Sequence, residues 1–330
     1  MKVAILHNPR PIAPDPSLPD DAFEEFDSAT TVAAIADALA GLGVSPVAVI
    51  ADRAAPRRLE EGAFDFVFNI AEGERGRCRE AIAPALCELL DIPYTGPDAL
   101  TLAVSLDKAI ARRIVAPNVP VASALLVDDE DDGADLTRLR YPVLVKPNHE
   151  GSSKGIRADA ICATPAAALE RARWVRARYG GPALAEEFLA GPEITVGIEG
   201  NGREARVLGM MEIAPAMASA EPFVYSLDVK RDWRHAVRYH VPPRVSPSVL
   251  ATVRDHALTA YRLLGCRDLA RLDFRLDGDE RPFFLECNAL PGLDPHNSDV
   301  VMLAEPATPY SDLVQGVLLS AGRRLGVPVP

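Results

Sequence analysis

The sequence predicts an α/β protein of two or three domains, with a parallel sheet near its N-terminus and a strand-rich C-terminal half. Strand and helix patterns alternate through residues 1–100 with short loops between them, which is typical of a parallel α/β sheet. From about residue 185 onward strand patterns dominate. The chain has 330 residues, more than a typical single domain. We expect domains over residues 1–100, 101–184 and 185–330.

Short apolar runs predict the strands of the first domain over residues 2–6, 46–50 and 64–70, with helices over 29–42 and 80–90. This order of elements is Rossmann-like. No GxGxxG motif follows the first strand, because residues 9–21 are rich in proline and aspartate instead. A dinucleotide site is therefore not expected.

The remainder of the chain continues with mixed elements. The patterns predict a helix around 106–115, strands over 122–127 and 143–146, and helices over 165–179, 249–264 and 310–325. The acidic run 128–132 is expected to be a solvated loop rather than a metal site, since consecutive carboxylates repel one another and point apart.

Composition excludes several classes of protein. The net charge of −12 argues against nucleic acid as a partner, which requires a basic surface. No apolar run approaches the roughly 18 residues of a membrane span, and the opening apolar segment is too short for a signal-peptide core. The five cysteines are scattered without a CxxC pair, which predicts reduced thiols. We therefore expect a soluble cytoplasmic protein.

Polar residues alternate along two segments that a turn at 277–279 would fold into a hairpin. Glu286 and Asn288 are two residues apart, as are Arg271 and Asp273, so each pair lies on one face of its strand. Two carboxylates and an amide oxygen suit Mg²⁺ bound together with substrate phosphates. The alternative is a solvated hairpin face, and the apolar flanking residues 283–285 argue against it.

A second segment adds a phosphate-binding pattern. The β-branched strand 141–147 contains Lys146 near its end and leads into the loop 149–155, HEGSSKG. Its glycines allow backbone N–H groups and the hydroxyls of Ser152 and Ser153 to approach phosphate oxygens. Alone, such a loop is more often a plain hairpin turn, and it lacks the Walker A pattern.

Five motifs in order resemble the ATP-grasp superfamily, and more narrowly the D-alanine–D-alanine ligases. They are YTG…LDK at 94–108, VLVKPNHEGSSKGI, EEFLAGPEITVGI, ARLDFRL and FFLECNALPGL, which together span about residues 64–300. The resemblance implies an ATP-grasp fold, with an α+β C-terminal lobe, that follows a Rossmann-like pre-ATP-grasp domain. It also implies an ADP-forming carboxylate–amine ligase that works through an acyl-phosphate. ATP and two Mg²⁺ ions, for which Mn²⁺ can substitute, are the implied cofactors.

The resemblance implies a role for each matching residue in ATP and metal binding. The phosphates would contact Lys108, Lys146, Glu150, Ser152 and Ser153. The adenine and ribose would contact Glu186, Glu187, Phe188, Leu189, Glu193 and Leu285. The metal ligands would be Asp273, Glu286 and Asn288.

Catalytic roles are implied for Arg271 and the backbone N–H of Gly292, which would hold an oxyanion, and for Lys230, on a lid over residues 217–232 that would reach the γ-phosphate. Ser152 would tie the glycine loop to this lid. Its usual tyrosine partner is replaced by Arg231, so Tyr225 is a substitute candidate.

The substrate-binding elements depart from the family pattern. The family's N-terminal loop and the element at 71–80 are replaced, which leaves Glu72 or Glu80 to hold a substrate ammonium group. The surrounding arginines would equally suit a carboxylate, and Glu80 could simply favour a helix N-terminus. At the other end His296, Asn297 and Ser298 are candidates for binding the second substrate.

The preferred function is a ligase that joins small amino acids, as a homodimer. A specialised amide-forming or ring-closing ligase of natural-product biosynthesis is the alternative. A non-catalytic ATP-binding protein is a second hypothesis, and direct phosphorylation of a carboxylate is a third.

Overall fold

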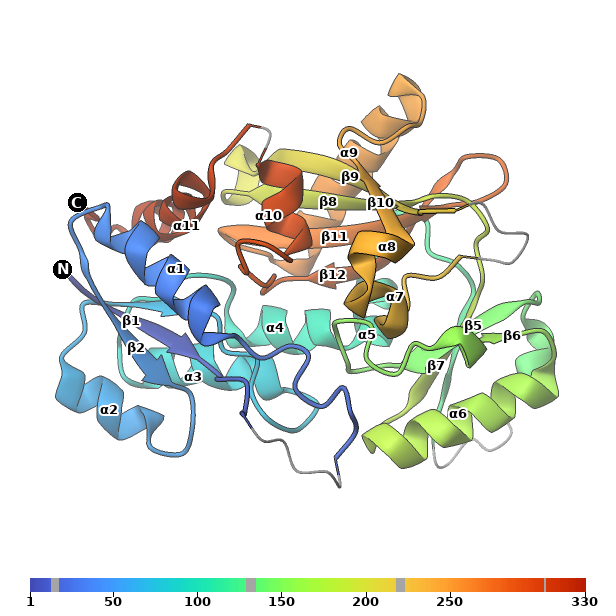
Figure 1. Ribbon diagram of the computed structural model, residues 1–330, viewed down its shortest axis with the longest axis horizontal. Helices are drawn as coiled ribbons and strands as arrows, with labels where there is room; N and C mark the ends of the chain where they lie inside the picture. Colours follow the sequence, from blue (N-terminus) through green and yellow to red (C-terminus); the bar gives the residue numbers. More distant parts are fainter. Residues whose placement is uncertain (13–17, 129–134, 218–222, 306) are drawn as a thin grey trace.

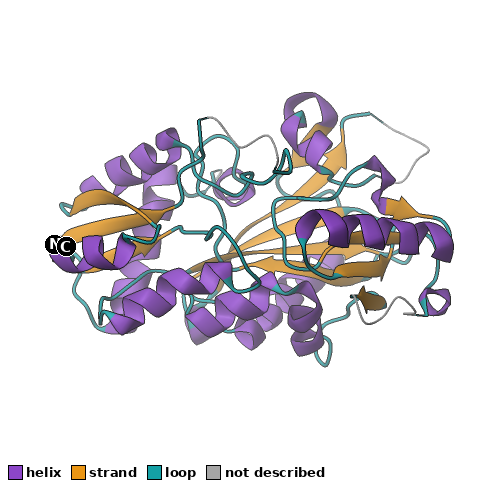
Figure 2. Cartoon of the chain, turned by 90° about the horizontal axis from the view of Figure 1, so that it is seen from below, coloured by secondary structure: helices purple, strands orange, loops and turns teal. Residues whose placement is uncertain are grey.

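The computed structural model describes residues 1–12, 18–128, 135–217, 223–305 and 307–330. The described residues form three sheets: an N-terminal sheet, a small sheet and a large sheet (Figure 1). Helices flank the sheets, and the two termini lie next to each other at one end of the molecule (Figure 2). The predicted mixed α/β class is confirmed.

The N-terminal sheet is fully parallel, as predicted, with the order β2-β1-β3. Its strands are β1 (Lys2–His7), β2 (Ser45–Ile50) and β3 (Phe66–Asn69), and its helices are α1 (Ala29–Ala40), α2 (Ala55–Gly62) and α3 (Ile82–Leu89). Helix α1 starts where the Ser28 hydroxyl accepts a hydrogen bond from the Thr31 N–H at 3.0 Å. Helix α2 has no counterpart in the predicted elements, because it is mostly charged and only Ala55 and Leu59 are buried.

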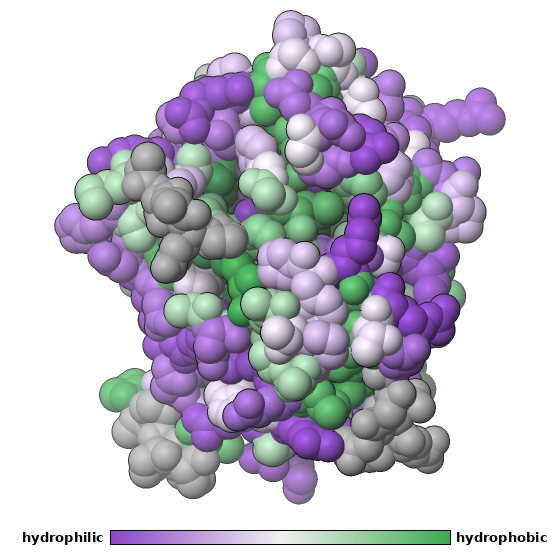
Figure 3. Space-filling view, turned by 90° about the vertical axis from the view of Figure 1, so that its right-hand side faces the viewer, coloured by the Kyte–Doolittle hydropathy of each residue, from purple (hydrophilic) through white to green (hydrophobic). Residues whose placement is uncertain are grey.

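The small sheet is antiparallel, with the order β4-β7-β5-β6. Its strands are β4 (Ala124–Val127), β5 (Val143–Pro147), β6 (Ile161–Cys162) and β7 (Ala183–Glu187), and helix α6 (Pro165–Tyr179) packs against it. Thr164 caps the start of α6, and Gly180 ends it with a positive φ of 68°. Hydrophilic residues cover most of this end of the molecule, with apolar residues set between them (Figure 3).

The large sheet is also antiparallel, with the order β10-β9-β8-β11-β12. Its strands are β8 (Glu193–Glu199), β9 (Arg206–Pro215), β10 (Val237–His240), β11 (Leu269–Leu276) and β12 (Pro282–Asn288). Helices α4 (Ala99–Leu106), α5 (Lys108–Val115) and α9 (Pro247–Leu264) share a buried core with this sheet. Helices α10 (Asp299–Ala304) and α11 (Tyr310–Leu325) pack together with α1 and the N-terminal sheet.

The predicted lid contains one short helix, α7 (Leu227–Arg231), and a second, α8 (Trp233–Ala236), follows it before β10. Both lie between the large sheet and the small sheet in Figure 1. Residues 218–222 of the predicted lid lie outside the described residues.

The helix expected around 106–115 corresponds to α5, and α4, which has no counterpart in the predicted elements, ends just before it. Asp107 leaves the helical conformation, with φ −85° and ψ 96°, and its side chain accepts the Ile110 N–H at 3.0 Å. Helices α4 and α5 contact the large sheet rather than the small one. The division at residues 100/101 and 184/185 stays a prediction.

None of the helices in the described ranges is both long and apolar enough to cross a membrane. The predicted acidic loop 128–132 lies outside the described residues except for Asp128.

Candidate active site

The hairpin of β11 and β12 brings its four polar residues together as the sequence predicts. Asp273 pairs directly with Glu286, and Arg271 pairs with Asn288. Arg271 donates to Asp273 at 3.0 Å, and the hydroxyl of Thr195 on the neighbouring strand donates to the same carboxylate at 2.8 Å. One sheet face therefore carries two carboxylates, an amide and a guanidinium.

This donor set fits Mg²⁺ better than a metal held by protein alone. No cluster of three histidine, cysteine, aspartate or glutamate side chains that could hold a metal occurs in the described part of the chain. Two carboxylates and an amide leave most of an octahedral shell to water and phosphate oxygens, which is how Mg²⁺ binds with nucleotides. Removal from water and the nearby Glu286 raise the pKa of Asp273, against the opposing effect of Arg271. A cation at this position would counter that rise.

Lys146 projects from β5 and forms a buried ion pair with Glu186 on β7, with 2.7 Å between Nζ and Oε1. Arg112 on α5 contacts the second carboxylate oxygen at 2.8 Å. Burial would raise the pKa of Glu186, but the two cations outweigh it and hold the pKa below its usual value. With two cations and one carboxylate, this group has a net charge of +1. Lys146 and Glu186 also line the cleft.

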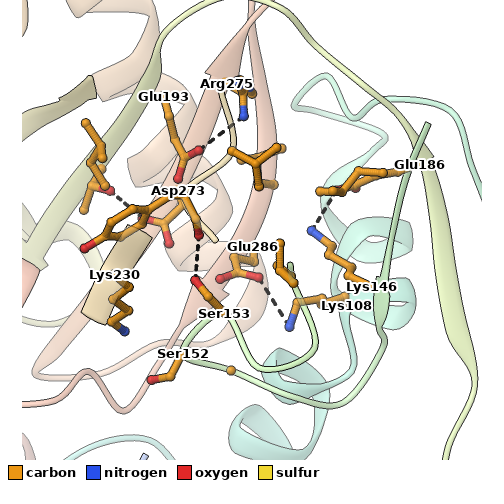
Figure 4. A pocket seen from close by; sticks show the side chains of 18 of the residues that line it. Lys108, Lys146, Ser152, Ser153, Glu186, Glu193, Lys230, Asp273, Arg275 and Glu286 are labelled. Carbon is orange, nitrogen blue, oxygen red and sulfur yellow. Dashed lines mark hydrogen bonds and ion pairs between the residues drawn. The ribbon is translucent and has the colours of Figure 1, made fainter. Parts of the chain in front are cut away.

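Lys108 lies next to Lys146, on the same side of Glu286 (Figure 4). Its Nζ lies 3.3 Å from Glu286 and also donates to the carbonyl oxygen of Glu150 (Figure 4). Burial would raise the pKa of Glu286, yet Lys108, Lys146 and Arg271 lower it to about 2. Glu286 is therefore ionised at neutral pH and is available to a divalent cation.

The loop after β5 has the geometry of an anion-binding turn. Ser152 and Ser153 both adopt positive φ, 49° and 58°, which is uncommon for residues with a side chain. Within the described residues their N–H groups have no hydrogen-bond acceptor. The Ser153 hydroxyl donates to the carbonyl of Tyr225 at 2.8 Å, so Ser153 connects the loop to the lid.

The inner cavity of the cleft is lined by all the residues expected to hold the adenine and ribose. These residues are Glu186, Glu187, Phe188, Leu189, Glu193 and Leu285. Burial, together with Asp273 and Glu286, raises the pKa of Glu193 to about 7, although Arg275 lies 3.4 Å away. The Glu187 side chain instead pairs with exposed Arg140 at 2.8 Å, and its backbone N–H donates to the carbonyl of Ser123 at 2.9 Å.

An outer cavity adjoins the inner one and shares part of its wall. The residues that line both are Lys108, Gly151, Ser152, Tyr225, Lys230, Arg271, Glu286 and Asp299. Arg271 lies between Asp273 and Asp299, with 3.4 Å to the latter. Gly292 lines the outer cavity, and a side chain there would meet open space.

Most predicted substrate residues line the outer cavity: Glu72, Glu80, Tyr225, Asn297 and Ser298. His296 is exposed and does not line it. The Tyr225 hydroxyl forms a hydrogen bond with the Tyr239 hydroxyl at 2.7 Å, so its partner is Tyr239 and not Ser152. The Ser298 hydroxyl donates to the carbonyl of Gly292.

The segment 18–27 supplies site residues that the sequence analysis missed. Glu25 accepts the Gly151 N–H at 2.8 Å and pairs with Arg79 and Lys154 at 2.9 and 3.2 Å. Burial would raise the pKa of Glu25, but Arg79 and Lys154 lower it to about 2. A Glu-Glu pair that ends three residues before a helix-capping serine was the available signal, and the divergence of residues 9–21 concealed it.

The same segment also connects the small sheet and its helix α6 to the lid. Asp21 accepts the Gly155 N–H at 3.0 Å and the Tyr179 hydroxyl at 2.7 Å. Arg231 on the lid pairs with Asp20 at 2.9 Å and with Glu24. The N-terminal segment therefore contacts the glycine loop, helix α6 and the lid.

Comparisons with known proteins agree with this geometry. The family model described as the D-ala D-ala ligase C-terminus matches residues 121–319. A Sinorhizobium fredii protein described as uncharacterized is 35% identical over 264 residues, covering 78% of this chain and 75% of its own. The D-alanine–D-alanine ligase of Bordetella avium is 33% identical over 273 residues, covering 82% of both chains.

A solved structure supports the fold. The D-alanine–D-alanine ligase from Bacillus anthracis, crystallised with ATP, superposes with a TM-score of 0.74 at 21% identity and covers 98% of each chain. The expected ATP-grasp fold is thereby confirmed. The chain belongs to the D-alanine–D-alanine ligase family and is an ATP-grasp ligase that forms amide bonds.

Proposed function

We propose that the protein uses ATP to join the carboxylate of one small amino acid to the amine of another through an acyl-phosphate, with D-alanine as the first substrate to test. The observation that supports this most directly is the position of Arg271. It lies on the wall shared by the inner and outer cavities, next to the residues suited to Mg²⁺. A phosphate in one cavity and a carboxylate in the other would meet there.

The inner cavity would hold ATP. Lys146 and Lys108 supply the positive charge for the phosphates, and the unpaired N–H groups of Ser152 and Ser153 face them from the glycine loop. Adenine would contact the Glu186 carboxylate and backbone groups at 187–189. Glu193 would accept hydrogen bonds from the ribose hydroxyls.

Asp273, Glu286 and Asn288 would hold Mg²⁺. The chemistry supplied by Mg²⁺ at this position would be neutralisation of charge on the phosphates during transfer. The chain's own contribution is to keep Glu286 ionised, through Lys108, and to hold Asp273 in place through Arg271 and Thr195.

The remaining residues would act on the substrate carbon. The Arg271 guanidinium and the Gly292 N–H would stabilise the oxyanion formed when the amine attacks. Lys230 on α7 would reach the γ-phosphate from the lid, and burial lowers its pKa. The lid would exclude water that could hydrolyse the acyl-phosphate.

Glu72 and Glu80 would bind a substrate ammonium group, while Asn297 and Ser298 would bind the second substrate. Their places in the wall of the outer cavity support this. His296 has no such support, and its role stays a prediction.

Phosphate release from ATP, first with D-alanine alone and then with D-, L- and β-amino acids, tests the proposal. Strong release with D-alanine would identify a D-alanine–D-alanine ligase. Release with another compound only would retain the ligase chemistry with a different substrate. Absence of release with every compound, although ATP binds, would refute it.

We further propose a homodimer that acts in the cytoplasm. The supply of ATP in that compartment and the five unpaired cysteines support the location. Light scattering on the purified protein tests the dimer.

A further inference from the structure

The wall of the outer cavity contains more acidic than basic side chains. Its lining includes eight carboxylates and six cationic side chains: Glu24, Glu25, Asp27, Glu72, Glu80, Glu286, Asp294 and Asp299 against Arg10, Lys108, Lys230, Arg231, Arg234 and Arg271. Four of these six cations already form ion pairs with acids of the same wall. Lys108 pairs with Glu286, Arg10 and Arg231 with Glu24, and Arg271 with Asp299.

Three of the carboxylates are left without a partner. In the described part of the chain, the side chains of Asp27, Glu72 and Glu80 make no hydrogen bond and no ion pair. Glu80 is only 8% exposed, yet it lines the cavity. The Oδ2 atom of Asp27 is buried and has no partner. A buried carboxylate without a hydrogen bond is costly, so a missing partner is the physical expectation.

Each unpartnered acid is repelled by a second carboxylate: Glu72 by Glu80, and Asp27 by Asp294. Removal from water and then Glu80 raise the pKa of Glu72. Removal from water and then Asp294 raise the pKa of Asp27. Asp294 also accepts the Thr31 hydroxyl at 3.0 Å, which fixes it beside the start of α1. Two repelling carboxylate pairs in one cavity can each be relieved by one cation.

Arg79 does not remove this surplus. Its guanidinium donates to the Glu25 carboxylate at 2.9 Å and to the carbonyl of His149 at 2.7 Å. Lys154 is likewise held by Glu25 and Glu150. Arg79 and Lys154 therefore neutralise Glu25 and Glu150 and form no ion pair with the three unpartnered acids.

We propose that one of the two amino acids joined by this enzyme carries a second cationic group, as in a diamino acid or a guanidino amino acid. Its α-ammonium would occupy one carboxylate pair, Glu72 with Glu80, and its side-chain cation the other, Asp27 with Asp294. D-Alanine, which has a single ammonium group, would leave one pair unrelieved. This inference depends on the proposed ligase function and specifies its substrate class.

Isosteric pairs of substrates separate charge from size. Phosphate release is measured with lysine and norleucine, and with arginine and citrulline, in both stereochemical forms, each alone and with D-alanine. We expect at least one cationic member to exceed its neutral isostere by about tenfold or more in kcat/KM. Neutral compounds that match or exceed every cationic partner would overturn the inference while leaving the ligase function intact.

Variants identify the residues responsible. Asp27→Asn and Glu80→Gln remove charge without removing volume, and each relieves repulsion, so folding is preserved. We expect Asp27→Asn to reduce the preference for the cationic compound about tenfold, whereas Glu80→Gln should weaken the cationic compound and its neutral isostere alike, because both carry an α-ammonium group. Glu61→Gln is the matched control, because Glu61 is an exposed acid on α2 outside this set of contacts. A preference unchanged in Asp27→Asn would overturn the assignment.

A binding measurement keeps the inference testable if no turnover is found. Calorimetry with lysine and norleucine, in the presence of a non-hydrolysable ATP analogue, reports affinity directly. Tighter binding of lysine that is lost in Asp27→Asn would support the cation site even though the proposed reaction had failed. Equal binding of the two compounds would overturn it.

Discussion

Variants of the buried group Lys146, Glu186 and Arg112 should affect ATP binding and the free energy of unfolding in different orders. Their side chains are 5%, 2% and 5% exposed. Replacing Lys146 by methionine leaves Glu186 paired with Arg112, a formally neutral pair. The loss is then one charge-assisted hydrogen bond, about 1.5–3 kcal/mol of unfolding free energy.

Replacing Glu186 by glutamine has the opposite consequence. It leaves two buried cations without a counter-charge, which costs about 3–5 kcal/mol. We therefore expect Glu186→Gln to be less stable than Lys146→Met by about 2 kcal/mol, the difference between the midpoints of these ranges. Urea-induced unfolding of the ligand-free proteins measures the order of the two variants.

ATP affinity should follow a different order. Lys146 lines the cleft, whereas Arg112 is not part of its lining. Lys146→Met should weaken ATP binding roughly 30-fold or more, since loss of a buried charge contact costs about 2 kcal/mol or more. Arg112→Met, which removes an equivalent cation from Glu186, should weaken it far less. The reasoning is refuted if Lys146→Met is the least stable variant, or if both lysine and arginine variants bind ATP alike.

Three further changes test other parts of the site. Arg271→Lys should lower the rate of phosphate release roughly 10²–10³-fold with a smaller effect on ATP affinity, because lysine cannot contact Asp273 and Asp299 together; an unchanged rate in a steady-state assay would contradict its role. The pKa of Glu80 is raised to about 8, by burial first and against Arg79, from an ordinary 4.5, so the folded state keeps a proton that the unfolded state loses. This stabilisation is complete below about pH 4.5 and is lost as pH rises to 8, at about 1.4 kcal/mol per pH unit at most; melting curves should show the wild type losing more stability than Glu80→Gln over that range, and parallel curves would contradict the shift. EDTA should abolish phosphate release, Mg²⁺ or Mn²⁺ should restore it, and Ca²⁺, which prefers more ligands and longer distances, should restore it poorly; activity that persists in EDTA would exclude the metal role.

The sequence predicts the nucleotide half of the site well because its residues lie on regular strands. The i, i+2 spacing of Asp273 with Arg271 and of Glu286 with Asn288 fixes which face they share, and the register of β11 with β12 then brings them together. The parallel N-terminal sheet and the long helices α6, α9 and α11 follow from periodicity for the same reason.

The substrate half depends on contacts that no local pattern encodes. Glu25 lies 126 residues from Gly151 along the chain, and only the packing of the N-terminal unit brings them together. Helix α2 has too few apolar residues for a periodic signal, and the break at Asp107 reflects side-chain capping inside an otherwise helical pattern. His296 has the right position in the sequence, but it is turned outward by the loop in which Asp294 accepts its N–H at 2.9 Å.

The bridging segment 18–27 has a consequence for exchanging parts between relatives. Because Asp21 and Glu25 hold the glycine loop while Asp20 and Glu24 hold Arg231, this segment cannot be grafted as an independent specificity module. A relative that lacks counterparts of Arg231 and Lys154 and receives this segment would gain four acids without these two counter-charges. New substrate preferences in this lineage would therefore require coordinated substitutions in three separate parts of the chain, which restricts how such ligases diverge.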